Sequence, residues 1–380
     1  MTRKYDVAVI GAGIVGLAHA WMAARRGLSV VMFDRSPRAE GATVRNFGMI
    51  WPIGQPAGEP YDIAMRSRQF WLKLDEQKVV RAEQCGSIHL AHHTDEMAIL
   101  EEFARQRNHD CRIYSRDETL SAIEIVNPHG LRGGLHSPTE LRVDPRLAAG
   151  NIGDWLESQF HVRRFFCTPV VRINGGDIES ANGERWSAER TVVCSGSDLQ
   201  TLFPHVLAES GLRLCKLQML RTVKQSESLR LAAHIASGLT LRHYKSFVDC
   251  PTLASLQRRI ASERPELDQY GIHVMATQSA DGSLILGDSH EYGDEICPFD
   301  KTEIDDLMLR ELRKIIQLSD WSIAERWHGV YTKHPDQPIF EGEPSPGVHV
   351  CVGPGGAGMT MAFGLADRFW NRWAGDSEND

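Results

Sequence analysis

The sequence predicts an α/β protein in which a Rossmann-type dinucleotide-binding domain is joined to a second, α+β domain with a mainly antiparallel sheet. Three observations lead to this prediction. A glycine fingerprint lies between a strand and a helix at the amino end, a second glycine-rich loop precedes a helix at the carboxy end, and hairpin-like strand patterns lie between them. The chain of 380 residues is long enough for two domains.

The stretch 5–34 has the order strand, tight turn, helix, strand. Gly11, Gly13 and Gly16 form a G-x-G-x-x-G pattern directly after the first apolar strand. In this pattern the first glycine permits the tight turn, the second lets the backbone approach a pyrophosphate, and the third lets the helix pack against the strand. Asp34 follows about twenty residues later, where an acidic side chain accepts hydrogen bonds from an adenosine ribose. The unit therefore predicts a dinucleotide site.

The composition excludes several classes of protein. The net charge is −8 and there is no basic run, which argues against a nucleic-acid partner. Eight scattered cysteines without a C-x-x-C pair argue against a metal site or a disulfide scaffold, and favour a cytoplasmic protein with reduced thiols. The apolar run near the amino end resembles a membrane span, but His19 and the three glycines interrupt it, so no membrane span is expected.

The second glycine-rich segment, 353–358, follows a short apolar strand and precedes a long apolar helix at 359–373. A nicotinamide-dependent dehydrogenase needs only the first loop. Two loops predict FAD held at both ends in a glutathione-reductase-like arrangement, with the dipole of the last helix directed at the flavin ring. An NAD-dependent dehydrogenase, or a flavin-bearing subunit without turnover of its own, remains an alternative.

The middle of the chain predicts the second domain. Strand-like segments are expected at 214–223, 240–247, 272–278 and 284–287, and an Asp-Gly hairpin turn at 281–282 joins the last two. An amphipathic helix is expected at 301–318. The expected division is an FAD-binding domain at 1–85, 145–211 and 335–380, and a substrate domain at 86–144 and 212–334.

The chain resembles the D-amino-acid oxidase, glycine oxidase and sarcosine oxidase family of FAD enzymes over nearly its whole length. The motifs that carry the resemblance are VAVIGAGIVGLAHA, GATVRNFGM, TVVCSGS, KLQMLRT, RWHGVYTKHPDQPIF and GPGGAGMTMAFGLA. The segments KLQMLRT, LRHYKSF and ILGDSHEYG further resemble a phosphonate-associated branch, whose members are thought to oxidise 2-aminoethylphosphonate or its N-alkyl forms.

The resemblance implies how the cofactor is bound and used. A hydride would pass from the carbon beside a neutral amine to flavin N5, the imine would hydrolyse, and oxygen or another acceptor would reoxidise the flavin. Sarcosine oxidases attach flavin through a cysteine where this chain has Gly329, so non-covalent FAD is expected. The implied FAD contacts are Gly11, Gly13, Ile14, Val15, Asp34, Arg35, Thr43, Arg45, Asn46, Gly48, Val170, Ser195, Gly196, Gly355, Gly356, Gly358, Met359 and Thr360.

The substrate is expected to be a small amine with an anionic group, as in an amino acid or an aminophosphonate. Such a group needs Arg, Lys or His in an otherwise apolar pocket. His328 and Lys333 are the expected anion contacts, and Met49 and Gln218 are expected to wall the pocket. Glycine-, sarcosine- or D-amino-acid-type oxidation is the alternative to aminophosphonate oxidation.

One further candidate is Tyr244, in the segment expected to be a strand at 240–247. Strand alternation would place Arg242 and Tyr244 on one face and His243 and Lys245 on the other. Spacing does not say which face meets the flavin, and Tyr244 is favoured.

Overall fold

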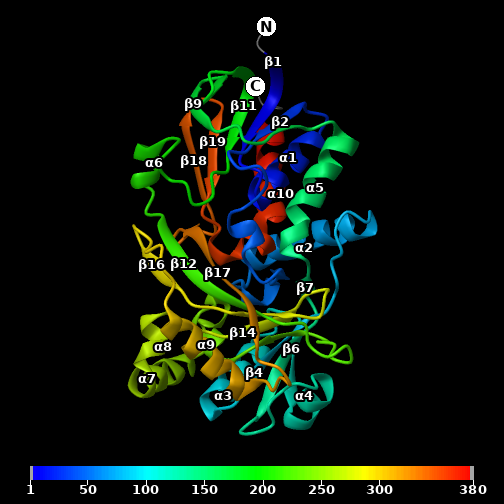
Figure 1. Ribbon diagram of the computed structural model, residues 1–380, viewed down its shortest axis with the longest axis vertical. Coiled ribbons are helices and arrows are strands. Elements are labelled where there is room, and N and C mark those ends of the chain that lie inside the picture. Colours follow the sequence, from blue (N-terminus) through cyan, green and yellow to red (C-terminus); the bar gives the residue numbers. More distant parts are fainter. Residues whose placement is uncertain (1–2, 377–380) are drawn as a thin grey trace.

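The computed structural model describes residues 3–376. Two large sheets lie towards opposite ends of the long axis, with the amino-terminal and carboxy-terminal segments together at one end (Figure 1). The expected mixed α/β fold is confirmed. The division into two domains at the expected limits stays a prediction.

The first sheet is eight-stranded in the described residues, with the order β18-β19-β11-β1-β2-β8 and with β10 and β9 joined beside β11. Its core is parallel: β1 pairs with β11 on one side and with β2 on the other. The four residues of β2 are all buried, as expected for a strand covered on both faces. Its strands are β1 (Arg3–Ile10), β2 (Val30–Phe33), β8 (Arg163–Phe165), β9 (Val170–Asn174), β10 (Asp177–Ser180), β11 (Arg185–Val193), β18 (Phe340–Ser345) and β19 (Val348–Val352).

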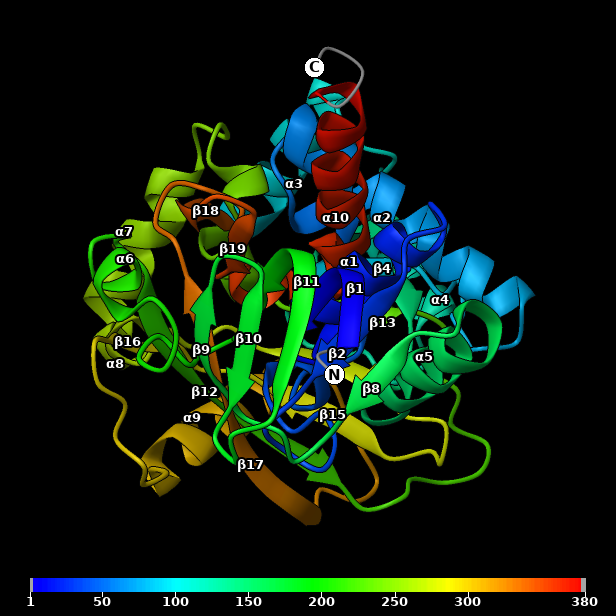
Figure 2. The same ribbon diagram turned by 90° about the horizontal axis from the view of Figure 1, so that it is seen from above.

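Helices from both ends of the chain pack together beside this sheet. The carboxy-terminal helix α10 contacts both α1 and α2, and Figure 2 shows α10 rising next to α1. Trp21 on α1 and Trp71 on α2 each meet Phe363 of α10 edge-on, with ring centroids 5.4 and 5.1 Å apart. These apolar contacts fix the last helix next to the first glycine turn. The helices here are α1 (Ile14–Ala24), α2 (Glu59–Glu76), α5 (Pro145–Phe160), α6 (Pro204–Ala208) and α10 (Gly358–Asp376).

The second sheet is nine-stranded in the described residues, with the order β16-β12-β15-β14-β13-β4-β6-β5 and with β17 paired to β12. Most of its pairs are antiparallel, whereas β13 and β4 are parallel. Its strands are β4 (Ser87–Ala91), β5 (Arg112–Ser115), β6 (Gly133–Ser137), β12 (Arg213–Thr222), β13 (His234–Ala236), β14 (Met275–Gln278), β15 (Leu284–Gly287), β16 (Glu291–Gly293) and β17 (Ile323–Lys333). A separate pair joins β3 (Met49–Ile50) to β7 (Leu141–Arg142).

The remaining helices lie at the end of the second sheet (Figure 1). They are α3 (Thr94–Gln106), α4 (Arg116–Ala122), α7 (Leu253–Glu263), α8 (Pro265–Gln269) and α9 (Thr302–Ile315). Short 3-10 turns are η1 (Ala42–Val44), η2 (Pro52–Gly54), η3 (Gly238–Arg242), η4 (Lys245–Phe247) and η5 (Gly355–Ala357).

The prediction of a strand at 240–247 is wrong. The backbone there makes local bonds, from His243 N to Thr240 O at 2.9 Å and from Phe247 N to Tyr244 O at 3.3 Å. It therefore forms η3 and η4, and side chains here do not alternate between two faces as they would in a strand. Leu241 and Phe247 are fully buried, so packing in the core explains the apolar residues that suggested a strand.

Strand β17, the partner of β12 over the whole length of β12, was not expected from the sequence. Most of its residues are only half-buried, and Glu325 and Arg326 interrupt any apolar pattern. Pairing with β12, which lies about a hundred residues earlier, decides its conformation.

Candidate cofactor and substrate site

One cavity of about 940 Å³ connects the two glycine loops with the second sheet. This volume lies at the upper end of the range, roughly 300–1,000 Å³, that is usual for ligand sites. The amino end of α1 and the turn before α10 both open into it. An ideal Cβ placed on Gly358 would lie 3.9 Å from Cγ2 of Ile14, so the two loops face each other closely.

The first loop needs its glycines for steric reasons. Gly11 has a φ of +107°, and a Cβ there would lie 2.2 Å from the carbonyl oxygen of Cys194. A Cβ on Gly16 would lie 1.9 Å from the carbonyl oxygen of Gly11. Neither contact is possible for a larger residue, so the turn keeps its shape and its backbone stays open to the cavity.

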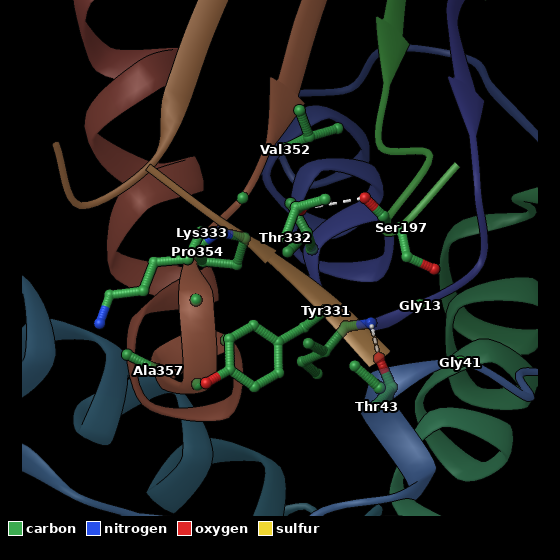
Figure 3. A pocket seen from close by; sticks show the side chains of 18 of the residues that line it. Gly13, Gly41, Thr43, Ser197, Tyr331, Thr332, Lys333, Val352, Pro354 and Ala357 are labelled. Carbon is green, nitrogen blue, oxygen red and sulfur yellow. Dashed lines mark hydrogen bonds between the residues drawn. The ribbon is translucent and has the colours of Figure 1, made fainter. Parts of the chain in front are cut away.

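Asp34 and Thr43 hold the neighbouring segments in place. The Asp34 carboxylate accepts hydrogen bonds from the amides of Ala12 and Ser36, at 2.8 and 2.9 Å. The Thr43 hydroxyl accepts one from the amide of Ile14 at 2.9 Å, drawn as a dashed line in Figure 3. One amide of the α1 amino end is therefore already bonded within the protein, whereas Gly13 provides no side-chain cap.

The second loop is fixed from two sides. Met359 accepts a hydrogen bond at its carbonyl from Nε1 of Trp71, at 2.9 Å. The backbone amide of Trp51 donates to the hydroxyl of Thr360 at 2.8 Å. Gly355 has a φ of +60°, and a Cβ there would contact the aliphatic stem of Lys333. Figure 3 shows Lys333 and Tyr331 on β17, crossing the site beside Pro354 and Ala357.

All the expected cofactor contacts except Gly48 line this cavity. A Cβ on Gly48, where φ is +74°, would lie 2.1 Å from the carbonyl oxygen of Val143, so this glycine serves the packing of the loop against Val143. Among the lining residues, Val170, Ser195 and Gly196 lie with Asp34 on the side of the first sheet.

The residues present fit FAD. A dinucleotide needs a ribose acceptor, a pyrophosphate turn and a second contact at the ring, and Asp34, Gly13 and the segment before α10 supply these in one cavity. The carboxylate of Asp34 at the ribose end disfavours a cofactor with a 2′-phosphate.

Three of the expected substrate residues line the same cavity: Met49, Tyr244 and Lys333. The hydroxyl of Tyr244 lies 3.3 Å from the sulfur of Met275, and burial raises the pKa of this hydroxyl. Burial also lowers the pKa of the Lys333 amine.

The expected roles of His328 and Gln218 need correction, because neither side chain lines the cavity. The two residues are opposite each other in the β12–β17 pairing. Nε2 of Gln218 donates to the Asp305 carboxylate at 2.9 Å, and Nδ1 of His328 lies 2.8 Å from the Asp300 carboxylate. Both side chains thus fasten the segment that leads into α9.

A group of four titratable side chains that was not expected from the sequence as a group lies together in the cavity wall: His243, His273, Asp288 and His290. A signal for part of this group was present. The Asp-Gly hairpin pairs β14 with β15, and just beyond this pair the backbones of His273 and Asp288 exchange hydrogen bonds of 3.3 and 3.0 Å. His243, which directly follows η3, joins them, and only the tertiary structure places it there.

No helix in residues 3–376 has both the length and the apolar character needed to cross a membrane. The fold and the cavity define a protein that holds a dinucleotide between two glycine loops. A family model described as FAD dependent oxidoreductase (DAO) matches residues 6–369, so the chain belongs to this family and the expectation of FAD is confirmed.

Similarity to individual proteins is weaker. The chain is 24% identical over 212 residues to glycine oxidase of Geobacillus kaustophilus, covering 52% of this chain and 56% of that protein. It is 41% identical over 49 residues to 3-oxosteroid 1-dehydrogenase of Mycobacterium tuberculosis, which covers 13% of this chain and only 9% of the dehydrogenase. The chain thus matches little more than half of the one relative and a short stretch of the other.

Solved structures share the fold at low identity. The glycine oxidase of Geobacillus kaustophilus superposes with a TM-score of 0.77 and 17% identity, over 97% of this chain and 94% of that one. Iminodiacetate oxidase from Chelativorans sp. BNC1 superposes with a TM-score of 0.71 and 19% identity, over 96% and 93% of the two chains. These likenesses establish the fold.

Proposed function

We propose that the protein catalyses the FAD-dependent oxidation of a small primary or secondary amine that carries an anionic group. The best candidate substrates are 2-aminoethylphosphonate and its N-alkyl forms, with phosphonoacetaldehyde as the product. The resemblance of three segments to a phosphonate-associated branch favours this substrate class.

The observation that carries the proposal is the position of Lys333. Its side chain is half-buried, lines the cavity beside the second glycine loop, and packs along Gly355. Within residues 3–376, the only hydrogen bond of this side chain is from Nζ to the Tyr292 hydroxyl at 3.4 Å. Nζ also lies 5.4 Å from the centroid of the Tyr292 ring, and it has no carboxylate partner there. A partly buried cation without a counter-charge is unfavourable, and the anionic end of a substrate would supply that charge.

Other residues in the cavity lining are also suited to the oxidation of an amine. Met49 and Trp51 are buried apolar surfaces in the cavity lining, which exclude water from the reacting carbon. Tyr244 gives that wall a polar group whose proton stays on the oxygen at neutral pH, since burial raises its pKa. Bound FAD supplies the acceptor for the hydride that leaves the carbon next to nitrogen.

Oxidation of an amino acid is the second candidate. A carboxylate would also pair with Lys333, and two proteins of the same fold are named glycine oxidase and iminodiacetate oxidase. An NAD-dependent dehydrogenase is disfavoured, because it leaves the second loop without a ligand.

An anaerobic reduction screen tests the proposal. The holoenzyme is mixed with 2-aminoethylphosphonate, its N-methyl form, glycine, sarcosine or D-alanine, and the flavin absorbance is followed. We expect bleaching with an aminophosphonate. Bleaching with the carboxylates alone would reject the aminophosphonate and keep amine oxidation, and no bleaching with any amine would reject both. Hydrogen peroxide formation in air then shows whether oxygen is the acceptor.

A further inference from the structure

Three histidines lie ring against ring in the wall of the cavity. The ring centroids of His243 and His273 are 3.9 Å apart, those of His243 and His290 4.4 Å, and those of His273 and His290 4.8 Å. Asp288 stands beside them, with carboxylate oxygens 3.5 Å from Nε2 of His273 and 3.7 Å from Nε2 of His290. All four residues line the cavity that also contains Lys333. We call this group the histidine cluster.

The histidine cluster has unused polar atoms although it is buried. His273 is 3% exposed, and neither of its ring nitrogens has a hydrogen-bond partner. One carboxylate oxygen of Asp288, which is 6% exposed, also has none. His290 uses Nδ1 for the carbonyl of Gly271, at 3.3 Å. Buried polar atoms are unfavourable when they are unpaired, so a ligand that hydrogen-bonds to His273 or Asp288 would relieve this cost.

A metal ion is a poor fit for this arrangement, although the ligating nitrogens lie within 4.8 Å of one another. The lone pairs of an imidazole lie in the plane of its ring. Here the planes of His273 and His290 differ by 17°, and that of His243 differs from them by 36° and 40°. Nearly parallel rings direct their lone pairs side by side, rather than at one point about 2.0–2.1 Å from each nitrogen.

The charges around the histidine cluster favour an anion. Burial and the nearby cations Lys333 and Arg242 lower the pKa of His243 and His273, so both rings are neutral in the ligand-free cavity. Burial lowers the pKa of His290 to about 3 and raises that of Asp288 well above its usual value. Asp288 is therefore a neutral acid here, and it does not repel an anion.

The other titratable groups near the histidine cluster add no negative charge that would repel an anion. Arg242 is already paired with Asp268 and donates to the carbonyl of Ile272 at 2.7 Å. Lys245 donates to the carbonyl of Pro335 at 2.6 Å. Tyr244, Tyr292 and Tyr331 stay protonated, because burial raises the pKa of each hydroxyl. Of the two lysines in the cavity lining for which the described residues provide no carboxylate partner, Lys333 has the longer and weaker hydrogen bond, at 3.4 Å, and is the one that we expect to share a ligand with the cluster.

We propose that His243, His273 and His290, with Lys333, form the subsite for the anionic end of the substrate, and that an imidazole of the cluster takes up a proton when a phosphonate binds. This rests on the proposed function. The proton comes from solvent and forms a ring N–H that donates to a phosphonate oxygen. An adjacent negative charge raises the pKa of an imidazole, and a doubly charged phosphonate raises it more than a carboxylate does. The subsite therefore selects phosphonates over carboxylates.

The test uses non-reacting probes, methylphosphonate and acetate, with the FAD-loaded protein. Isothermal titration calorimetry in two buffers of different ionisation enthalpy counts the protons taken up at each pH between 6.5 and 8.5. The variants are His273→Asn and the matched control His92→Asn, whose side chain lies outside the cavity and contacts the carbonyl of Asn127. Flavin content and melting temperature show whether each variant is folded. The difference between wild type and variant cancels the ionisation of the probe itself.

We expect wild type and His92→Asn to take up more protons with methylphosphonate than His273→Asn does. We expect His273→Asn to bind it about tenfold or more weakly, as for the loss of a charge-assisted hydrogen bond. The pKa of the imidazole is higher in the complex than in the free protein. The extra affinity is thus complete below the pKa in the free protein, falls by up to about tenfold per pH unit as the pH rises towards the pKa in the complex, and is gone above it.

Equal proton uptake by wild type and His273→Asn would overturn the inference, as would tighter binding of acetate than of methylphosphonate. Zinc binding that is tight in wild type and lost in His273→Asn would identify a metal site instead, and would also overturn it. If His273→Asn does not retain FAD, His290→Asn replaces it in the same comparison with wild type. Proton-coupled binding of methylphosphonate without reduction by any amine would reject the proposed function and keep the subsite.

Discussion

The backbone amide of Trp51 donates a 2.8 Å hydrogen bond to the hydroxyl of Thr360, 309 positions later in the chain. Both residues line the cavity, Thr360 in the first turn of α10 and Trp51 in the segment next to Tyr244. This buried bond ties the glycine loop expected at the flavin to the wall expected at the substrate.

Replacing Thr360 by Ala removes that bond and leaves the Trp51 amide buried without a partner. We expect the unfolding free energy to fall by about 1–3 kcal/mol and FAD to bind more weakly. Thr360→Ser keeps the hydroxyl and is the matched control. Thermal unfolding with and without added FAD measures both effects, and an alanine variant that behaves like the serine variant would show that the bond is unimportant.

Gly11→Ala places a Cβ 2.2 Å from the carbonyl oxygen of Cys194, at a φ of +107°. The turn then has to move, and we expect loss of bound FAD. Gly150→Ala is the control, because this glycine lies within α5 with no atom within 4 Å of the added Cβ. Alanine at that position is expected to be neutral or to stabilise by roughly 0.5–1 kcal/mol. Flavin absorbance of the purified proteins gives the result.

Lys333→Met keeps the aliphatic stem against Gly355 and removes the charge. If Lys333 pairs with the anionic end of the substrate, we expect KM to rise about tenfold or more, with a smaller change in kcat. Lys224→Met removes a charge from an exposed ion pair with Glu227 and is the control. Steady-state kinetics with an anionic amine and with an uncharged amine tests this prediction, since only the KM of the anionic amine should rise in Lys333→Met.

The stability of the protein is expected to fall in mild acid because of buried neutral histidines. Burial lowers the pKa of His89 to about 3, and neither ring nitrogen has a partner. Above pH 6.5 both the folded and the unfolded state keep this ring neutral, so it has no effect on the pH dependence there. Below pH 6.5 the unfolded state binds the proton first, and by pH 5 this costs about 2 kcal/mol.

His89→Leu should therefore reduce the loss of unfolding free energy between pH 7.5 and pH 5. His129→Leu, on the exposed surface, should leave it unchanged. Urea unfolding at the two pH values compares the variants. A loss that is the same in wild type and His89→Leu would show that other groups cause the acid sensitivity.

Flavin should be released completely by acid precipitation of the protein. Gly329, at the place where sarcosine oxidases carry their flavin-linked cysteine, lies in the cavity lining next to Arg45 and Leu217. It has no side chain with which to form a bond. Absorbance at flavin wavelengths that remains in the pellet would contradict this prediction.

The local sequence pattern was sufficient to predict an element where one short segment contains all the residues that determine its conformation. The strand, glycine turn and helix that end at Asp34 depend on apolar residues and glycines within about thirty positions, and the structure has these elements as expected. The loop before α10 was recognisable for the same reason. Gly48 is different, because a glycine is required there by close contact with the carbonyl of Val143. That contact joins distant parts of the chain, so no local pattern reveals it.

The sequence by itself determined the family, the cofactor and most of the glycine-loop residues that line the cavity, since backbone turns and apolar strands are set by neighbours in the chain. Only the tertiary structure decided the part of the cavity wall that comes from the second sheet and the turns beside it. It turned the segment at Tyr244 into 3-10 turns, directed His328 and Gln218 towards Asp300 and Asp305, and brought His243 against His273 and His290. Side-chain direction across a sheet depends on which strands pair and what packs on them, and these contacts join residues that are far apart in the chain.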